Sequence, residues 1–179
     1  MRVDEFGEVP ALPSGWSPAP PPLAGAEQLS FRSAPVGQYL KARRHKDLLF
    51  VSGHSPVRPD GTRVTGKVGP GALSLDEAVA AAELVALGLL STIRAELGSL
   101  DNLEAVLKIF GTVNSTNGFN QAPAVIDGCS KTLEKWLGPR ASAHARTAIC
   151  VAELPFDIPV EIDAVVAVAE RREAQTPAH

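Results

Sequence analysis

The stretch that decides the fold is ARTAICVAELPFDIPVEIDAVVAV, residues 145–168. It reads as two apolar strands joined by a Leu-Pro-Phe-Asp connection, where the proline prevents a helix and the aspartate favours a turn. Glu161 stands near the start of the second strand and points away from its main apolar face, because side chains alternate along a strand. If the two strands pair, the guanidinium of Arg146 and the carboxylate of Glu161 come within reach of one small molecule.

Two helices are predicted upstream of this stretch. Ser74 and Glu77 have the spacing of a capping box, apolar residues then recur at helical intervals, and Gly98 ends the first helix. The second helix is predicted to begin at Pro123, which suits the first helical turn, and to be stopped by Gly138 and the proline after it.

Three further strands complete the predicted elements. Residues 38–42 and 48–51 indicate an antiparallel hairpin whose polar turn is the basic run 43–47, and residues 103–113 alternate well enough to form a strand. Strands and helices in this order predict an α+β domain with one helix layer on an antiparallel-rich sheet. The other sheet face then needs a partner surface.

Composition narrows the class of protein. The chain has 179 residues, of which 45% are hydrophobic, so it predicts one globular domain with a sizeable core. A net charge of −3 gives no basic footprint, which argues against a nucleic-acid partner.

Cysteine and hydropathy patterns bear on the compartment. Cys129 and Cys150 fall in a predicted helix and a predicted strand, which favours two buried reduced thiols over a disulfide. No charged start leads into an apolar run, and no span of about 20 apolar residues is expected, so we predict a soluble cytoplasmic protein without membrane contact. No close-spaced pair of histidines or cysteines suggests a metal site.

Four motifs occur here in the order in which one known family has them. They are APVGQY (34–39), LLFVSG (48–53), TGKVG (65–69) and the stretch from Arg146 to the VEIDA motif (160–164). Over residues 33–168 the chain resembles the RidA (YjgF) family, also labelled endoribonuclease L-PSP. The resemblance implies a chorismate-mutase-like fold, with two helices on one sheet face, assembled as a homotrimer with pockets at the subunit clefts.

The same resemblance implies a domain division. Residues 33–170 form the RidA-like domain, residues 1–32 a Pro/Gly-rich N-terminal extension, and residues 171–179 a C-terminal tail. Polyproline-like or irregular structure is expected in the extension. It serves either as a docking arm over a neighbouring subunit or as a solvated tail.

The activity implied is hydrolytic deamination of reactive 2-imino or enamine acids, without a cofactor. By resemblance, Arg146 grips the carboxylate of a small substrate, as a planar two-pronged donor can, and Glu161 orients the attacking water. A structural ion pair at a subunit interface is the alternative for these two residues. The further candidate substrate-binding residues are Tyr39, Ser52, Gly53, His54, Asn114, Phe119, Gln121 and His144. For Tyr39, Ser52 and His54, structural roles remain open.

Two departures from the deaminase pattern keep other functions open. The pocket cysteine of the deaminases is replaced by Ala148, and their pocket asparagine aligns near Pro123. The chain resembles a longer subgroup that lacks this cysteine. A non-catalytic carboxylate-binding or regulatory trimer, or a pathway-specific enzyme that uses the same pocket, are therefore alternatives, whereas a ribonuclease is disfavoured.

Overall fold

The structure is a computed structural model that describes Leu29 and residues 35–169. The elements are β1 (Ala42–His45), β2 (Leu48–His54), α1 (Leu75–Leu97), β3 (Leu103–Asn114), α2 (Ala122–Ala141), β4 (Ala145–Val151) and β5 (Val160–Val168), with short 3₁₀ turns at Leu100–Asn102 and Pro155–Asp157. The predictions for the Pro-rich extension and for the C-terminal tail fall on residues outside this description, Leu29 excepted.

The strands form one mixed sheet in the order β1-β2-β5-β3-β4. Neighbouring strands are antiparallel except β3 and β4, which are parallel because α2 carries the chain back between them. The predicted α+β class is therefore confirmed, with two helices over the sheet.

The conditional pairing of β4 with β5 is wrong, because β3 lies between them. β5 alternates buried and half-buried residues along its whole length, and it takes the centre of the sheet. β4 has no fully buried residue and forms an edge. Apolar sequence alone did not distinguish the two positions.

The first hairpin is displaced from its prediction. β1 begins at Ala42 and includes most of the basic run, so only Lys46 and Asp47 remain as the turn. Lys46 has a positive φ of 54°, and its carbonyl accepts a hydrogen bond from Arg44 Nε. A second guanidinium nitrogen of Arg44 donates to the carbonyl of Ala169, so this arginine ties the strand to the end of β5.

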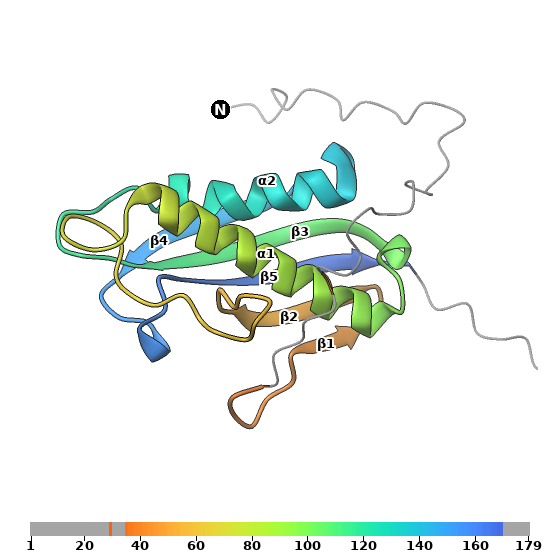
Figure 1. The fold of residues 1–179 in the computed structure, drawn as a ribbon. Coiled ribbons are helices and arrows are strands. Elements are labelled where there is room, and N and C mark those ends of the chain that lie inside the picture. The colour runs from red at the N-terminus through yellow and green to blue at the C-terminus, as the bar shows by residue number, and fades with distance from the viewer. Residues whose placement is uncertain (1–28, 30–34, 170–179) are drawn as a thin grey trace, which may run out of the picture.

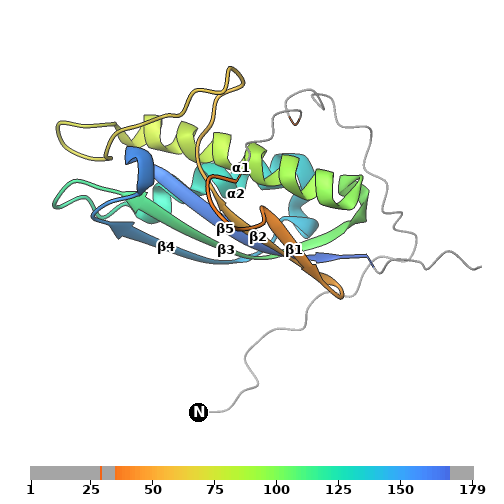
Figure 2. The same cartoon turned by 90° about the horizontal axis from the view of Figure 1, so that it is seen from below.

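Both helices cover the same face of the sheet (Figures 1 and 2). The capping box of α1 is present: the Ser74 hydroxyl accepts from the Glu77 amide, and the Glu77 carboxylate accepts from the Ser74 amide. Gly98 ends the helix at φ 80°, as predicted. α2 has proline in its first turn and breaks at Gly138, whose φ and ψ are 77° and 164°.

α1 corrects one expectation about hydropathy. With 23 residues and a mean hydropathy of 1.6 in its most apolar window, it is long and apolar enough to cross a membrane, judged by length and composition alone. One face of the helix is nevertheless buried against the sheet and α2, in the main hydrophobic cluster; its buried apolar residues are Ala78, Ala81, Ala82, Val85, Ala86, Leu89, Leu90 and Ile93. Burial of this kind identifies α1 as a core helix.

The opposite face of the sheet is not covered by any described element (Figure 2). Phe50 and Ile149 stand on this face and are 46% and 43% exposed. Their register partners Val165 and Thr112 lie on the same face. An uncovered sheet face that carries exposed large apolar side chains is typical of a surface that packs against another subunit.

Candidate functional site

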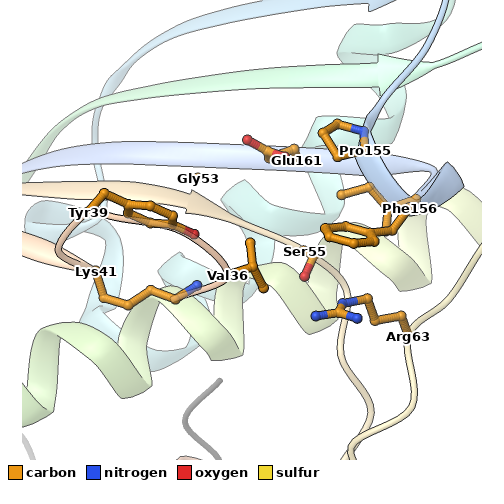
Figure 3. A pocket seen from close by; sticks show the side chains of 10 residues that line it. Val36, Tyr39, Lys41, Gly53, Ser55, Arg63, Pro155, Phe156 and Glu161 are labelled. Carbon is orange, nitrogen blue, oxygen red and sulfur yellow. The ribbon is translucent and has the colours of Figure 1, made fainter. Parts of the chain in front are cut away.

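A pocket of about 330 Å³ lies where β2, β5 and the segment before β1 meet the 155–157 turn (Figure 3). Three of the residues predicted for the site, Tyr39, Gly53 and Glu161, line it together. The complete lining is Val36, Tyr39, Lys41, Gly53, Ser55, Arg63, Pro155, Phe156, Ile158 and Glu161.

Gly53 determines where the Glu161 carboxylate lies. A Cβ added to Gly53 would stand 2.2 Å from Oε1 of Glu161 and 2.9 Å from its Cδ. The carboxyl group therefore rests directly against the β2 backbone, in space that any other residue would occupy. The register of β2 with β5 is irregular between Val51 and His54, next to this contact.

The environment of the pocket makes the Glu161 carboxyl group easier to protonate than an exposed glutamate. Desolvation and the negative charge of Asp163 raise the pKa of Glu161, while the ammonium of Lys41 acts in the opposite direction. Burial lowers the pKa of Lys41, the charge of Glu161 raises it, and that of Arg63 lowers it. A carboxyl group with a raised pKa, in a pocket, is suited to accept and return a proton.

The turn at Pro155–Asp157 forms one end of the pocket. Phe156 and Asp157 have positive φ values of 59° and 54°, a backbone conformation that non-glycine residues rarely adopt. The side-chain amide of Asn114 donates to Asp157 Oδ1 at 3.2 Å, and the Gly66 amide donates to the Asp157 carbonyl at 2.7 Å. These bonds hold the strained turn in place.

Asn114 itself is fully buried and does not line the pocket. Its side-chain oxygen accepts from Lys67 Nζ at 3.2 Å, and Lys67 also donates to the Ala152 carbonyl and to Glu153. Asn114 thus supports the 155–157 turn without lining the pocket itself.

Arg146 lies away from Glu161 within one subunit. Its β3 partner in the parallel register is Ile109, which is buried beneath the helices, so Arg146 is on the helix side of the sheet. Its guanidinium donates to Asp127 at 2.6 Å and to Ser130 at 3.1 Å, both on α2. Glu161 is on the opposite face, since the flanking Val160 and Ile162 are the buried residues of β5.

His144 lies in a second, shallower hollow beside Arg146. This hollow has a volume of about 390 Å³ and also contains Asp127 and Ser130. The Ser130 hydroxyl is 3.1 Å from His144 Nε2, and the other ring nitrogen bonds to the Ser142 carbonyl. Because that carbonyl can only accept, Nδ1 is the donor in that bond, and in the neutral ring Nε2 accepts from Ser130.

The remaining predicted residues do not line the pocket, and their contacts are structural. The Ser52 hydroxyl donates to the Leu40 carbonyl and so fixes the segment that carries Tyr39. His54 is 3% exposed and bonds to the Ser52 carbonyl and to Thr92 of α1. Phe119 packs against the core, and Gln121 is the exposed N-cap residue of α2.

Sequence reasoning missed four polar or aromatic residues of the pocket: Lys41, Ser55, Arg63 and Phe156. Lys41 follows Tyr39 by two residues, and this spacing was the available signal. Arg63 is brought in by the long loop between β2 and α1, and its guanidinium lies 4.9 Å from the centre of the Phe156 ring. No local pattern in the sequence indicates that contact.

The two cysteines lie in α2 and β4. Cys129 and Cys150 are free thiols; Cys129 is buried and Cys150 partly buried. Burial raises the pKa of Cys129 to about 12, so its thiol is not nucleophilic. Ala148 packs partly against the core, and Pro123 is exposed in the first turn of α2.

Comparison with known proteins agrees with this architecture. Protein TCP17 of Trypanosoma cruzi is 36% identical over 139 residues, which cover 78% of this chain and 86% of that protein. The crystal structure of Atu1372 from Agrobacterium tumefaciens, a protein of unknown function, is 31% identical with a TM-score of 0.70, covering 79% of this chain and 88% of that one.

Two more distant structures share the fold. The YjgF gene product of E. coli has a TM-score of 0.54 at 21% identity and covers 75% of this chain and 91% of its own. RidA from an Antarctic Psychrobacter has a TM-score of 0.52 at 23% identity, covering 75% and 92%. The family model described as endoribonuclease L-PSP matches residues 31–168. The chain therefore belongs to the endoribonuclease L-PSP family, the family of RidA and YjgF.

Proposed function

We propose that this protein is a hydrolytic deaminase of reactive 2-imino acids and their enamine tautomers. The observation that carries the proposal is the Glu161 carboxyl group, held against the Gly53 backbone in a pocket with Tyr39 on its wall, with its pKa raised by burial. Such a group can take a proton from a bound water and later deliver one to a leaving nitrogen.

The reaction balances with water as the only co-reactant. Glu161 accepts a proton as the water oxygen bonds to the imine carbon and returns it to the imine nitrogen, which gives a neutral carbinolamine. Glu161 then takes the hydroxyl proton of the carbinolamine and delivers it to the amino nitrogen as the carbon–nitrogen bond breaks, so that ammonia leaves and the carbonyl group of a 2-oxo acid forms.

We further propose that Arg146 binds the substrate carboxylate from a neighbouring subunit. Arg146 and Glu161 stand on opposite faces of one sheet, so one subunit does not bring them together. Among the described contacts, Arg146 donates to Asp127 and Ser130 only through Nη1. Its other guanidinium nitrogens are therefore available to bind a ligand. The neighbour would be supplied by a homotrimer in which the edge strand β4, which carries Arg146, lies beside the Glu161 pocket of the next subunit.

The absence of the pocket cysteine, at Ala148, favours one alternative function. A carboxylate binder or regulator without catalysis would still use Arg146 for its ligand but has less need of Glu161. A binder needs no proton-transfer group, so the effect of changing Glu161 separates the two functions.

The test is a coupled assay of imine decay. Amino-acid oxidases generate 2-imino acids from alanine, 2-aminobutyrate and glutamate, and the loss of each imine is followed with and without the protein. Glu161→Gln is expected to lower the catalysed rate by about 100-fold or more, the scale of general acid–base catalysis. Arg146→Ala is expected to raise KM strongly, because it removes a charge-assisted carboxylate contact.

Glu83→Gln on α1 and Lys135→Ala on α2 are the matched controls, since both wild-type residues are exposed on the helix layer and neither lines the pocket. Both are expected to keep wild-type rates. The proposal fails if the folded protein accelerates the decay of none of the three imines, or if Glu161→Gln leaves the acceleration intact.

A further inference from the structure

Two cationic side chains face the pocket opposite Glu161. Figure 3 shows Lys41 and Arg63 on one side of the pocket and Glu161 on the other, with Tyr39 and Phe156 toward its two ends. Lys41 reaches the pocket from the segment before β1, and Arg63 from the loop between β2 and α1. The two cations thus converge from separate parts of the chain.

These cations lie close enough to influence one another. Apart from burial, the pKa of Lys41 responds to the charges of both Glu161 and Arg63. Neither Lys41 nor Arg63 forms an ion pair with a carboxylate of the described residues. Two neighbouring cations that contact no carboxylate in an ion pair repel each other, and an anionic ligand offsets that cost.

Arg63 is held ready for such a ligand. Its guanidinium stacks on Phe156 at 4.9 Å from the ring centre, and Phe156 occupies the strained turn fixed by Asn114. Stacking leaves the edge of the guanidinium plane free, and that edge is the part that donates to a carboxylate. Strain kept at a pocket wall is common at ligand-binding positions.

We infer that Lys41 and Arg63 bind a second carboxylate on the ligand, so that this pocket selects dicarboxylic 2-imino or 2-oxo acids. The inference rests on the proposed function for the position of the ligand, whose reacting carbon lies near Glu161. The two cations and Glu161 leave one net positive charge in the pocket, which matches one additional carboxylate. The cavity of about 330 Å³ accommodates a ligand of this size.

The test compares two ligands of similar size that differ in one charge. Binding of 2-oxoglutarate and of 2-oxovalerate is measured by isothermal titration calorimetry with the full-length protein. The wild type is expected to bind 2-oxoglutarate at least about tenfold more tightly, as a charge-assisted contact predicts. Lys41→Met and Arg63→Gln are each expected to reduce this ratio substantially, because each weakens the binding of 2-oxoglutarate more than that of 2-oxovalerate.

Lys135→Met is the matched control, because Lys135 is exposed on α2 and does not line the pocket. It is expected to keep the full preference, and Lys41→Arg, which preserves the charge, to keep most of it. Circular dichroism verifies the fold of each variant. The inference is overturned if the wild type binds both acids equally, if it binds neither at millimolar concentration, or if the preference survives both charge-removing changes.

Failure of the proposed function has a different signature. If the protein prefers 2-oxoglutarate but accelerates the decay of no imine, the dicarboxylate site stands and the deaminase proposal fails. If it hydrolyses all three imines without preferring the one from glutamate, the deaminase proposal stands and the dicarboxylate inference fails.

Discussion

Gly53 is the residue on which the position of the Glu161 carboxylate depends. The three heavy atoms nearest to a methyl group there all belong to the flexible side chain of Glu161, and the φ of Gly53 is not in the left-handed region. Gly53→Ala is therefore expected to displace Glu161 and lower kcat for imine hydrolysis by at least about tenfold, because small misplacements of a catalytic group are costly.

The free energy of unfolding of Gly53→Ala is expected to change by less than about 1 kcal/mol, as measured by urea titration. Gly37→Ala is the control, since its added Cβ would meet only Tyr39, at the ordinary distance of 3.5 Å. Wild-type kcat in Gly53→Ala would show that the close contact with the backbone is not needed for catalysis.

His54 is a buried neutral histidine, and this gives the stability a pH dependence. Burial, with a contribution from the charge of Lys41, lowers its pKa to about 4, against the bond to the Ser52 carbonyl. At pH above 6.5 the ring is neutral whether the chain is folded or unfolded. Between pH 6.5 and 4 the unfolded state binds the proton more readily, so the free energy of unfolding falls as the pH is lowered, by up to about 3 kcal/mol.

Urea unfolding at pH 7, 6, 5 and 4 measures this loss, with His54→Gln for comparison. The raised pKa values of Glu161 and Asp163 contribute with the opposite sign at the acidic end, and the variant retains these contributions. The difference between the two proteins therefore isolates the histidine. Parallel curves for wild type and variant would contradict the assignment.

At the scale of elements, Gly128 allows α2 to approach α1 closely. A Cβ at Gly128 would stand 2.4 Å from the backbone carbonyl oxygen of Val79, which cannot move without shifting α1. Helix propensity alone predicts that Gly128→Ala stabilises the protein by about 1 kcal/mol. The clash reverses the sign, and we expect a loss of about 1–3 kcal/mol in unfolding free energy.

Thermal and urea unfolding of Gly128→Ala decide the sign. Ala124→Gly in the same helix reports the propensity effect without a clash, because Ala124 is only partly buried. A more stable Gly128→Ala protein would show that the two helices have room to separate.

At the scale of the whole molecule, the uncovered sheet face is expected to mediate self-association. Phe50 and Ile149 lie on that face and are nearly half exposed. Phe50→Asp and Ile149→Asp place charge on it and are expected to shift the protein from oligomer to monomer, since burying an unpaired charge is unfavourable.

Sedimentation velocity measures this shift, with Lys135→Asp on the exposed side of α2 as the control for added negative charge. If the monomeric variants also lose imine hydrolysis, the result supports a site completed by Arg146 of a neighbouring subunit. A wild-type protein that sediments as a monomer would contradict the proposed assembly.

The sequence by itself determined the elements and the family. The capping box at Ser74, the glycine at the end of α1 and the alternation along β5 are local signals, because backbone hydrogen bonding and side-chain periodicity depend on near neighbours. The motif around Arg146 and Glu161 identified the family for the same reason, since its spacing is a property of the chain alone.

The tertiary structure alone decided which elements are neighbours. β3 separates β4 from β5 because strand order depends on which faces can be buried together, and two apolar strands adjacent in sequence carry no information about that choice. The same long-range packing placed Arg146 and Glu161 on opposite sides of one sheet and brought Lys41 and Arg63 to the pocket of Glu161. Contacts between residues far apart in the chain leave no periodic trace in its sequence, and the charge pattern of the pocket is therefore visible only in the folded protein.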